Sequence, residues 1–283
     1  MRKLSSPRLD LTDRVLALSL GLILLVAITA PLLPLPDPNL QQMGMRLTPP
    51  WPLAESSPEH LLGTDHLGRD MLARILAGAR LTLLIAFAGV ALGGLFGVTM
   101  GFVAGYFGGW VDVAITRVID AQLALPFILL AMGIVAARGR SITVLIFTLA
   151  VVSWAHYARL VRSDTQVVST HVYIRALKAA GLPTRQIILR HIVPNVGGTI
   201  LVVATLEIGT LVLGESALSF LGLGVVSPDI SWGAMLAEGR AHIRESWWVV
   251  AFPGMAISAL VLLVNLLGDG LHRAYDPRKV EYR

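Results

Sequence analysis

LTLLIAFAGVALGGLFGVTMGFVAGY, residues 81–106, decides the fold of this chain. The stretch holds no charged side chain, and about 20 apolar residues in a helix suffice to cross the roughly 30 Å hydrocarbon layer of a bilayer. Within it, glycine recurs at every fourth position, at Gly89, Gly93, Gly97, Gly101 and Gly105. Small residues on one stripe let two membrane helices approach closely. The stretch therefore predicts a membrane span whose glycine stripe packs against another helix, in this chain or in a second subunit.

Five further apolar runs are long enough to span a bilayer. They cover residues 15–33, 111–137, 142–160, 196–221 and 247–267. Hydrophobic residues make up 55% of the chain, charged residues only 14%, and the mean hydropathy is +0.71, which is too apolar for an ordinary soluble domain. We predict an all-α fold, a polytopic membrane protein with six transmembrane helices. Residues 1–80 supply a cytoplasmic tail, the first helix and an extracytoplasmic loop, and residues 81–283 supply a core of five helices.

The distribution of Lys and Arg predicts the orientation. Basic residues precede the first run as they do in a secretory signal, but about 19 apolar residues exceed the usual length of a signal core, so we interpret the run as a span. With the amino terminus inside, fourteen Lys and Arg residues lie on the cytoplasmic side and eight on the other. Cytoplasmic loops carry the excess of positive charge. Both termini and the loop at about 162–195 are therefore predicted to be cytoplasmic, and the net charge of +5 indicates topology and lipid contact rather than nucleic-acid binding.

Several polar residues suggest sites outside this pattern. His60, Asp65, His66 and Asp70 are residue types that bind metals, but a helix cap at Thr64 or Asp65 and surface ion pairs explain them better. The chain has no cysteine, which excludes disulfides and thiol catalysis.

Charged residues inside spans are functional candidates because they are expensive to insert. Arg117 and Asp120 are three residues apart, and we expect them to pair on one helix face. Glu207 lies near the middle of its run. Three interpretations are open: it faces a translocation path and meets a cationic group on the cargo, it bonds to a neighbouring helix, or it is protonated. We expect three further polar residues to be interfacial: Glu215, Asn265 and Asp269.

YIRALKAAGLPTRQIILRHIVPN, residues 173–195, is a basic segment between two spans. Its pattern predicts a short helix that ends at Gly181 and a second that begins at Pro183, with Pro194 opening the next span. Two interpretations remain at this point: a handle for a partner protein, or an amphipathic pair that lies on the membrane surface.

This segment resembles the cytoplasmic signature of binding-protein-dependent ABC importer permeases of the dipeptide, oligopeptide and nickel branch. Ala176, Gly181, His191 and Pro194 match by spacing, whereas Arg175 replaces the usual acidic residue and Leu177 the usual second alanine. Five more segments look like the same branch, in the same order, and most like its smaller permease subunit. They are HLLGTDHLGRDMLARILAGAR, AGYFGGWVD, WAHYARLVRS, ESALSFLGLG and LLGDGLHRAYDPR.

The resemblance implies the type I ABC importer permease fold and a non-catalytic subunit in the bacterial cytoplasmic membrane. Lys occurs only at positions 3, 178 and 279, never after Gly, so the chain has no phosphate-binding loop of the Walker type. The implied partners are a second homologous permease, two ATP-binding subunits that hold ATP and Mg, an extracytoplasmic solute-binding protein and a peptide cargo. No cofactor or metal on this chain is implied. The residues expected to contact the ATP-binding subunit are Arg175, Ala176, Leu177, Gly181, His191 and Pro194. Nickel cargo and a secondary transporter are the alternatives.

Overall fold

The computed structural model describes residues 11–275, and every regular element in that range is helical. The long helices are α1 (Leu11–Thr29), α2 (Met71–Phe107), α5 (Ile142–Ser169), α8 (Val193–Phe220) and α10 (Trp248–Tyr275). The shorter ones are α3 (Gly109–Leu123), α4 (Phe127–Arg138), α6 (Val172–Ala179), α7 (Thr184–Ile187) and α9 (Trp232–Gly239). Five helices are long and apolar enough to cross a membrane, or six when α3 and α4 count as one bent span. The all-α, multi-pass prediction is confirmed.

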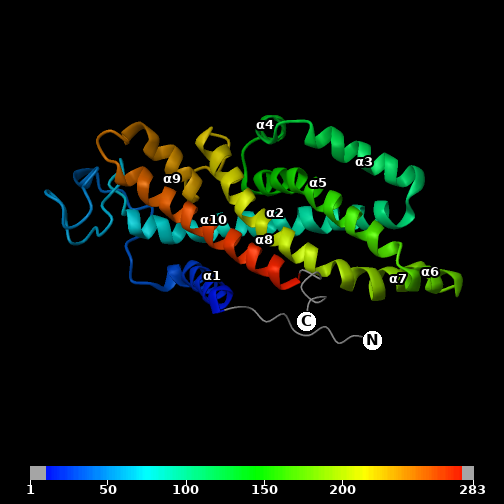
Figure 1. The fold of residues 1–283 in the computed structure, drawn as a ribbon. Helices are drawn as coiled ribbons and strands as arrows, with labels where there is room; N and C mark the ends of the chain where they lie inside the picture. The colour runs from blue at the N-terminus through cyan, green and yellow to red at the C-terminus, as the bar shows by residue number, and fades with distance from the viewer. Residues whose placement is uncertain (1–10, 276–283) are drawn as a thin grey trace.

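The long helices join two ends of the molecule (Figure 1). The loop from residue 34 to residue 70 and α9 lie at one end, and α6 with α7 at the other. α1 runs away from the α6 end, whereas α10 runs towards it. The predicted cytoplasmic tails, residues 1–10 and the part of the C-terminal tail from residue 276, lie outside the described residues.

The glycine stripe of α2 packs against α5 of the same chain. A Cβ added at Gly101 would lie 2.8 Å from the Cβ of Val161, and one at Gly105 would lie 2.7 Å from the Cβ of Thr165. At Gly93 and Gly97 an added Cβ would overlap Ser153 and the backbone of Trp154. At the first glycine of the stripe, Gly89, an added Cβ would meet Leu211 of α8 at 2.9 Å. Glycine is required here because the two helix backbones nearly touch.

The third predicted span is broken, which corrects the single run at residues 111–137. α3 and α4 meet at an angle of 90°. The break falls at Pro126, which has no N–H group to donate and restricts the residue before it to extended backbone. After the turn, Phe127 packs so tightly on α8 that a Cβ at Gly214 would lie 2.7 Å from its ring. α3 and α4 together are long and apolar enough for one span, but they are two helices.

α2 begins ten residues before the predicted start of its span, at Met71. Its N-cap is Asp70, whose carboxylate accepts a hydrogen bond from the Ala73 N–H at 2.7 Å. The prediction of Thr64 or Asp65 as the cap is therefore wrong. Asp65 instead accepts hydrogen bonds from the backbone N–H groups of Leu67 and Arg69, at 2.8 and 3.0 Å, and so holds the turn before the helix.

Charge pairs tie α3 to α5, which corrects the expected pairing within α3. Asp120 accepts a hydrogen bond from Arg159 of α5 at 2.7 Å, so its partner is not Arg117. About two helical turns earlier, both carboxylate oxygens of Asp112 accept hydrogen bonds from Arg162, and the bond to Oδ2 is 2.7 Å long. A helix of mixed polarity is thus held against the apolar bundle by charges that both helices supply.

Candidate functional site

The α6–α7 segment forms a cap that is anchored on its inner side and open on its outer side. Ile174, Ile187 and Ile192 are fully buried in it. They belong to one apolar cluster with residues at the ends of α2, α5 and α8, namely Phe102, Val161, Val168 and Val196. Most of the other side chains of α6 are exposed, including Val172 at 83%. The cap is therefore packed on three of the long helices while its outer face is exposed.

Gly181 makes the turn between the two short helices. Its φ is +75°, a left-handed conformation that glycine adopts without strain. The Leu182 N–H donates to the Leu177 carbonyl at 3.2 Å and the Gly181 N–H to the Lys178 carbonyl at 3.1 Å, which is the Schellman pattern of a helix C-terminus. The predicted elbow is present at this residue. An added Cβ would meet nothing within 4 Å, so the residue needs glycine for its backbone alone.

The residues predicted to face a partner fall into two groups. Arg175, Ala176, Gly181 and Pro194 are exposed. Leu177 is half-buried and packs on the apolar cluster beneath the cap, so it faces the interior of the protein.

His191 is half-buried as well, with its ring 6.4 Å from that of Tyr173. Asn195 donates to the His191 carbonyl at 2.5 Å and to the Tyr173 hydroxyl at 3.3 Å. These contacts connect α6 to the start of α8. Lys178 adds a connection to the end of α2, with its ammonium 4.2 Å from the centre of the Tyr106 ring.

The second short helix runs into α8 without a break. A π-helical turn at Ile188–Ile192 joins α7 to α8, and Pro194 is one of the first two residues of α8. Because proline has no N–H group, the regular i to i−4 ladder cannot continue through this position. The expected helix start at Pro194 is thus a change in helix type. The cap is therefore continuous with α8.

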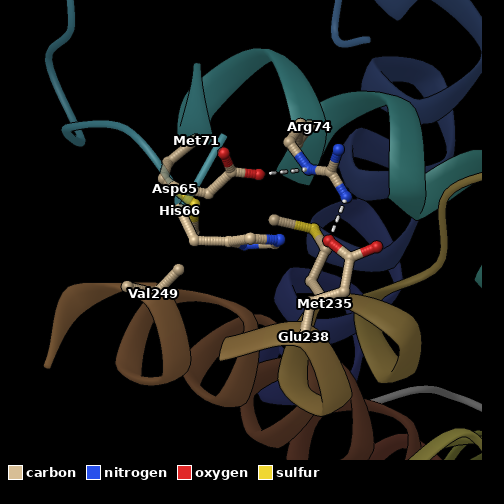
Figure 2. Close-up of a pocket in the computed structure, with 7 residues that line it drawn as sticks. All are labelled: Asp65, His66, Met71, Arg74, Met235, Glu238 and Val249. Atoms are coloured by element: carbon tan, nitrogen blue, oxygen red, sulfur yellow. Dashed lines mark hydrogen bonds and ion pairs between the residues drawn. The ribbon is translucent and has the colours of Figure 1, made fainter. Parts of the chain in front are cut away.

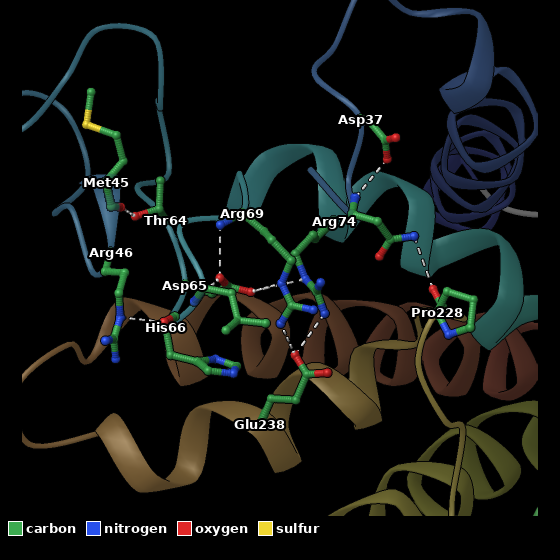
Figure 3. Close-up of polar contacts among 12 residues, drawn as sticks. Asp37, Met45, Arg46, Thr64, Asp65, His66, Arg69, Arg74, Pro228 and Glu238 are labelled. Carbon is green, nitrogen blue, oxygen red and sulfur yellow. Dashed lines mark hydrogen bonds and ion pairs between the residues drawn. The ribbon is translucent and has the colours of Figure 1, made fainter. Parts of the chain in front are cut away.

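A charged network lies at the opposite end, between the loop before α2 and α9 (Figures 2 and 3). Glu238 accepts hydrogen bonds from Arg69 at 2.6 Å and from Arg74 at 2.9 Å. Asp65 accepts from Arg69 at 2.6 Å, and Arg74 lies 3.6 Å away. Asp65 and both arginines are at most 4% exposed. The network joins α2 to α9 across the sequence.

The metal-site hypothesis is not favoured by this geometry. Ligand atoms of Asp65, His66 and Glu238 lie within 4.8 Å of one another. However, the two carboxylates already accept hydrogen bonds from two guanidinium groups, whose charges balance theirs. His60 and Asp70, from the same predicted group, pair separately at 2.8 Å.

The His66 ring stacks on that of His242 at 5.4 Å. Burial lowers the pKa of the His66 imidazole below its ordinary value. Met71, Met235 and Val249 complete the lining of a small pocket around these charged residues and His66 (Figure 2). The sequence did not predict that Glu238 and Arg74 lie beside Asp65, because no local pattern relates these residues.

Glu207 bonds to a neighbouring helix. Its Oε1 lies 2.9 Å from the Nδ1 of His156 on α5, and only 7% of the residue is exposed. Glu215, expected at the membrane interface, lies five residues before the end of α8, is buried, and accepts hydrogen bonds from Ser219 and Ser231, both at 2.7 Å. Asn265 and Asp269 are exposed on α10.

These features define a class: a multi-pass membrane protein whose long helices connect a buried charge network at one end to a rigid cap at the other. The chain belongs to the family described as "Binding-protein-dependent transport system inner membrane component", whose profile matches residues 93–281. That match falls within the predicted core at 81–283.

Relatives and solved structures agree with this assignment. The chain is 43% identical to the dipeptide transport system permease protein DppC of Alkalihalophilus pseudofirmus, over 90% of this chain and 82% of that protein. It is 40% identical to the di/tripeptide transport system permease protein DppC of Pseudomonas aeruginosa, over 91% and 85%. An inward-facing structure of the MetNI methionine ABC transporter covers 73% of this chain and 98% of its own with a TM-score of 0.60 at 21% identity, which supports the fold.

Proposed function

We propose that this chain is one of the two membrane subunits of an ATP-driven peptide importer. Family membership and the peptide permeases among its relatives support this. A secondary transporter is not favoured, because the family depends on a binding protein. Nickel is not favoured as cargo, because the relatives described above carry peptides.

The proposed partners are a second, homologous permease, two ATP-binding subunits and an extracytoplasmic solute-binding protein. ATP and Mg belong to the ATP-binding subunits, and this chain binds no cofactor of its own. The α6–α7 end and both termini face the cytoplasm of a bacterial cell, where the excess of basic residues agrees with the orientation. The charge network between the loop and α9 then lies on the outer face, where the binding protein delivers its cargo.

The observation that carries the proposal is the two-sided cap. Its exposed face, with Arg175, Ala176 and Gly181, contacts an ATP-binding subunit. Its buried face, with Ile174 and Ile187, holds the ends of α2, α5 and α8. When nucleotide draws the two ATP-binding subunits together, the caps follow, and the spans open outwards to accept cargo. Hydrolysis resets them. Coupling of this kind requires contacts that differ between the two states, and a rigid cap supplies them.

The test compares two arginine substitutions in the complete transporter, reconstituted in proteoliposomes. Gly181→Arg places a bulky side chain on the outer face of the cap and strains its backbone. Gly139→Arg is the matched control, because Gly139 also has positive φ (+84°), nothing within 4 Å of an added Cβ, and a place at a helix C-terminus. ATPase activity is measured with the binding protein and dipeptides, longer peptides or nickel.

We expect peptides to stimulate the wild type and Gly139→Arg, and Gly181→Arg to assemble but lose that stimulation. Gly181→Asn, which tolerates the left-handed conformation, should retain most of it. Stimulation by nickel alone would reassign the cargo. Full stimulation of Gly181→Arg would refute the coupling role of the cap.

A further inference from the structure

His156 and Glu207 meet at the middle of two long helices, α5 and α8. α5 and α8 are each 28 residues long, and the two residues are the fifteenth of their helices. At a rise of about 1.5 Å per residue, each lies roughly 20 Å from either end of its helix. Both residues therefore lie inside candidate membrane spans, where ionisable groups are costly and mark substrate or ion pathways.

The pair is incomplete as it stands. The Glu207 side chain is 9% exposed, and its Oε1 is engaged by the His156 Nδ1 at 2.9 Å. Its Oε2 is buried and has no hydrogen-bond partner among the described residues. The hydroxyl of Tyr157, next to His156 on α5, is also buried without a partner there. Buried polar atoms are normally satisfied, so an unused carboxylate oxygen at this depth indicates a place for a donor.

The surface beside the pair is not suited to hydrocarbon. The His156 side chain is 44% exposed although it lies inside a candidate span. Ser163 is exposed seven residues later, which is two turns along the same helix face. Polar groups at this depth face protein or a water-filled cavity rather than lipid. The seam between α5 and α8 therefore borders a hydrated space or a second subunit.

The seam is acidic. Asp164, eight residues after His156, accepts a hydrogen bond from Thr199 of α8. The described residues include no Lys or Arg in an ion pair with Glu207 or Asp164. Arg159, the basic residue between His156 and Asp164 on α5, donates to Asp120 of α3 instead. Two carboxylates along the seam are thus held by an imidazole and a hydroxyl, and no Lys or Arg among the described residues forms an ion pair with them.

We propose that Glu207 is the subsite that receives the positively charged amino-terminal group of the peptide as it passes between the membrane spans. The ammonium donates to the unused Oε2 and takes the place of His156 at Oε1. His156 holds the carboxylate between passages, and Asp164 is the next acceptor towards the cytoplasm. The cargo part of this inference rests on the proposed function, whereas the charge and accessibility of the seam do not.

The test uses the absence of cysteine in the chain. Leu160 lies one turn after His156 on α5 and is 45% exposed, so Leu160→Cys is a single reactive probe beside the site. In the assembled transporter, its labelling is compared between a methanethiosulfonate that carries trimethylammonium and one that carries sulfonate, with mass spectrometry of this chain. Leu18→Cys on α1, at a position that is 74% exposed, is the control for a surface that faces lipid.

We expect Leu160→Cys to react about tenfold faster with the cationic reagent, because the carboxylates of Glu207 and Asp164 along the seam concentrate cations. Leu18→Cys should react with neither. Glu207→Gln added to Leu160→Cys should reduce the preference several-fold, and Glu207→Asp should restore most of it. An unreactive Leu160→Cys, or a preference that Glu207→Gln leaves unchanged, would overturn the proposal.

A peptide pair then tests the ammonium itself. A tripeptide with a free amino group should slow cationic labelling of Leu160→Cys, and the N-acetylated tripeptide should not. Equal protection by both forms would overturn the role of the amino group. If instead the wild-type transporter shows no peptide-stimulated ATPase activity, the proposed function fails, and the reagent preference is judged independently of it.

Discussion

Gly101→Ala is expected to separate α2 from α5. The added Cβ would lie 2.8 Å from the Cβ of Val161 and 2.9 Å from the carbonyl oxygen of Ala158. Carbon atoms in good contact are about 3.5–4.0 Å apart, so the helices must move by roughly 1 Å. A carbonyl oxygen within a helix cannot turn away as a flexible side chain can. Overpacking of this kind costs about 1–3 kcal/mol.

Gly197→Ala is the matched control. Gly197 lies in α8, and an added Cβ there meets nothing within 4 Å. Both substitutions gain the better helix propensity of alanine, up to about 1 kcal/mol in water. The difference between the two variants therefore isolates the overpacking of α2 against α5.

The assay is thermal unfolding of the purified protein in lipid nanodiscs. At about 2–4 °C per kcal/mol for a chain of this size, Gly101→Ala should unfold about 2–12 °C below Gly197→Ala. Gly101→Val should unfold lower still, because two more methyl groups enter the same contact. If Gly101→Ala and Gly197→Ala unfold at the same temperature, α2 and α5 do not approach as closely as described, and the steric role of the stripe is refuted.

Two further predictions concern the charge network. Glu238→Gln removes the carboxylate that Arg69 and Arg74 share and should lower stability by about 3 kcal/mol, since two buried guanidinium groups lose a partner. The exposed Glu245→Gln changes the net charge equally and should have no effect on the unfolding temperature; equal losses in the two variants would contradict the role of the network. Burial lowers the pKa of His66 in the folded protein, so as pH falls the unfolded chain binds a proton at this residue before the folded protein does. The contribution of His66 to the free energy of unfolding is therefore complete above about pH 6.5 and is lost as pH falls through the lowered folded-state pKa. His66→Phe should lose less stability than the wild type between pH 7.5 and 5.5, and an identical loss would show that His66 does not titrate in this way.

Local patterns predicted the elements whose cause is local. Gly181 at a positive φ followed from a glycine after a helical run and a proline two residues later, because helix termination depends on neighbouring residues. The tight approach of α2 to another helix followed from the spacing of glycines on one face. The bend at Pro126 was missed because hydropathy is continuous across α3 and α4, although proline itself was a visible signal.

The partners of the charged residues could not be predicted in this way. Arg69 and Glu238 are 169 residues apart in the chain, and His156 and Glu207 are 51 apart. Asp120 had a basic residue within reach on its own helix, yet it pairs with Arg159, which is 39 residues away. Nothing in a span of sequence states which of several charges the folded chain brings within hydrogen-bond distance.

The amino-acid sequence by itself determined that this protein crosses a membrane several times, that one of its helices packs through glycine, and that a basic cap with an elbow joins two spans. These properties follow from hydropathy, periodicity and backbone preference, which act over a few residues. Only the tertiary structure decided that the stripe packs on α5, that the third span is broken by 90°, and that Glu207 meets His156 with one oxygen unused. Those outcomes depend on which helices become neighbours, and that is settled by the packing of the whole bundle.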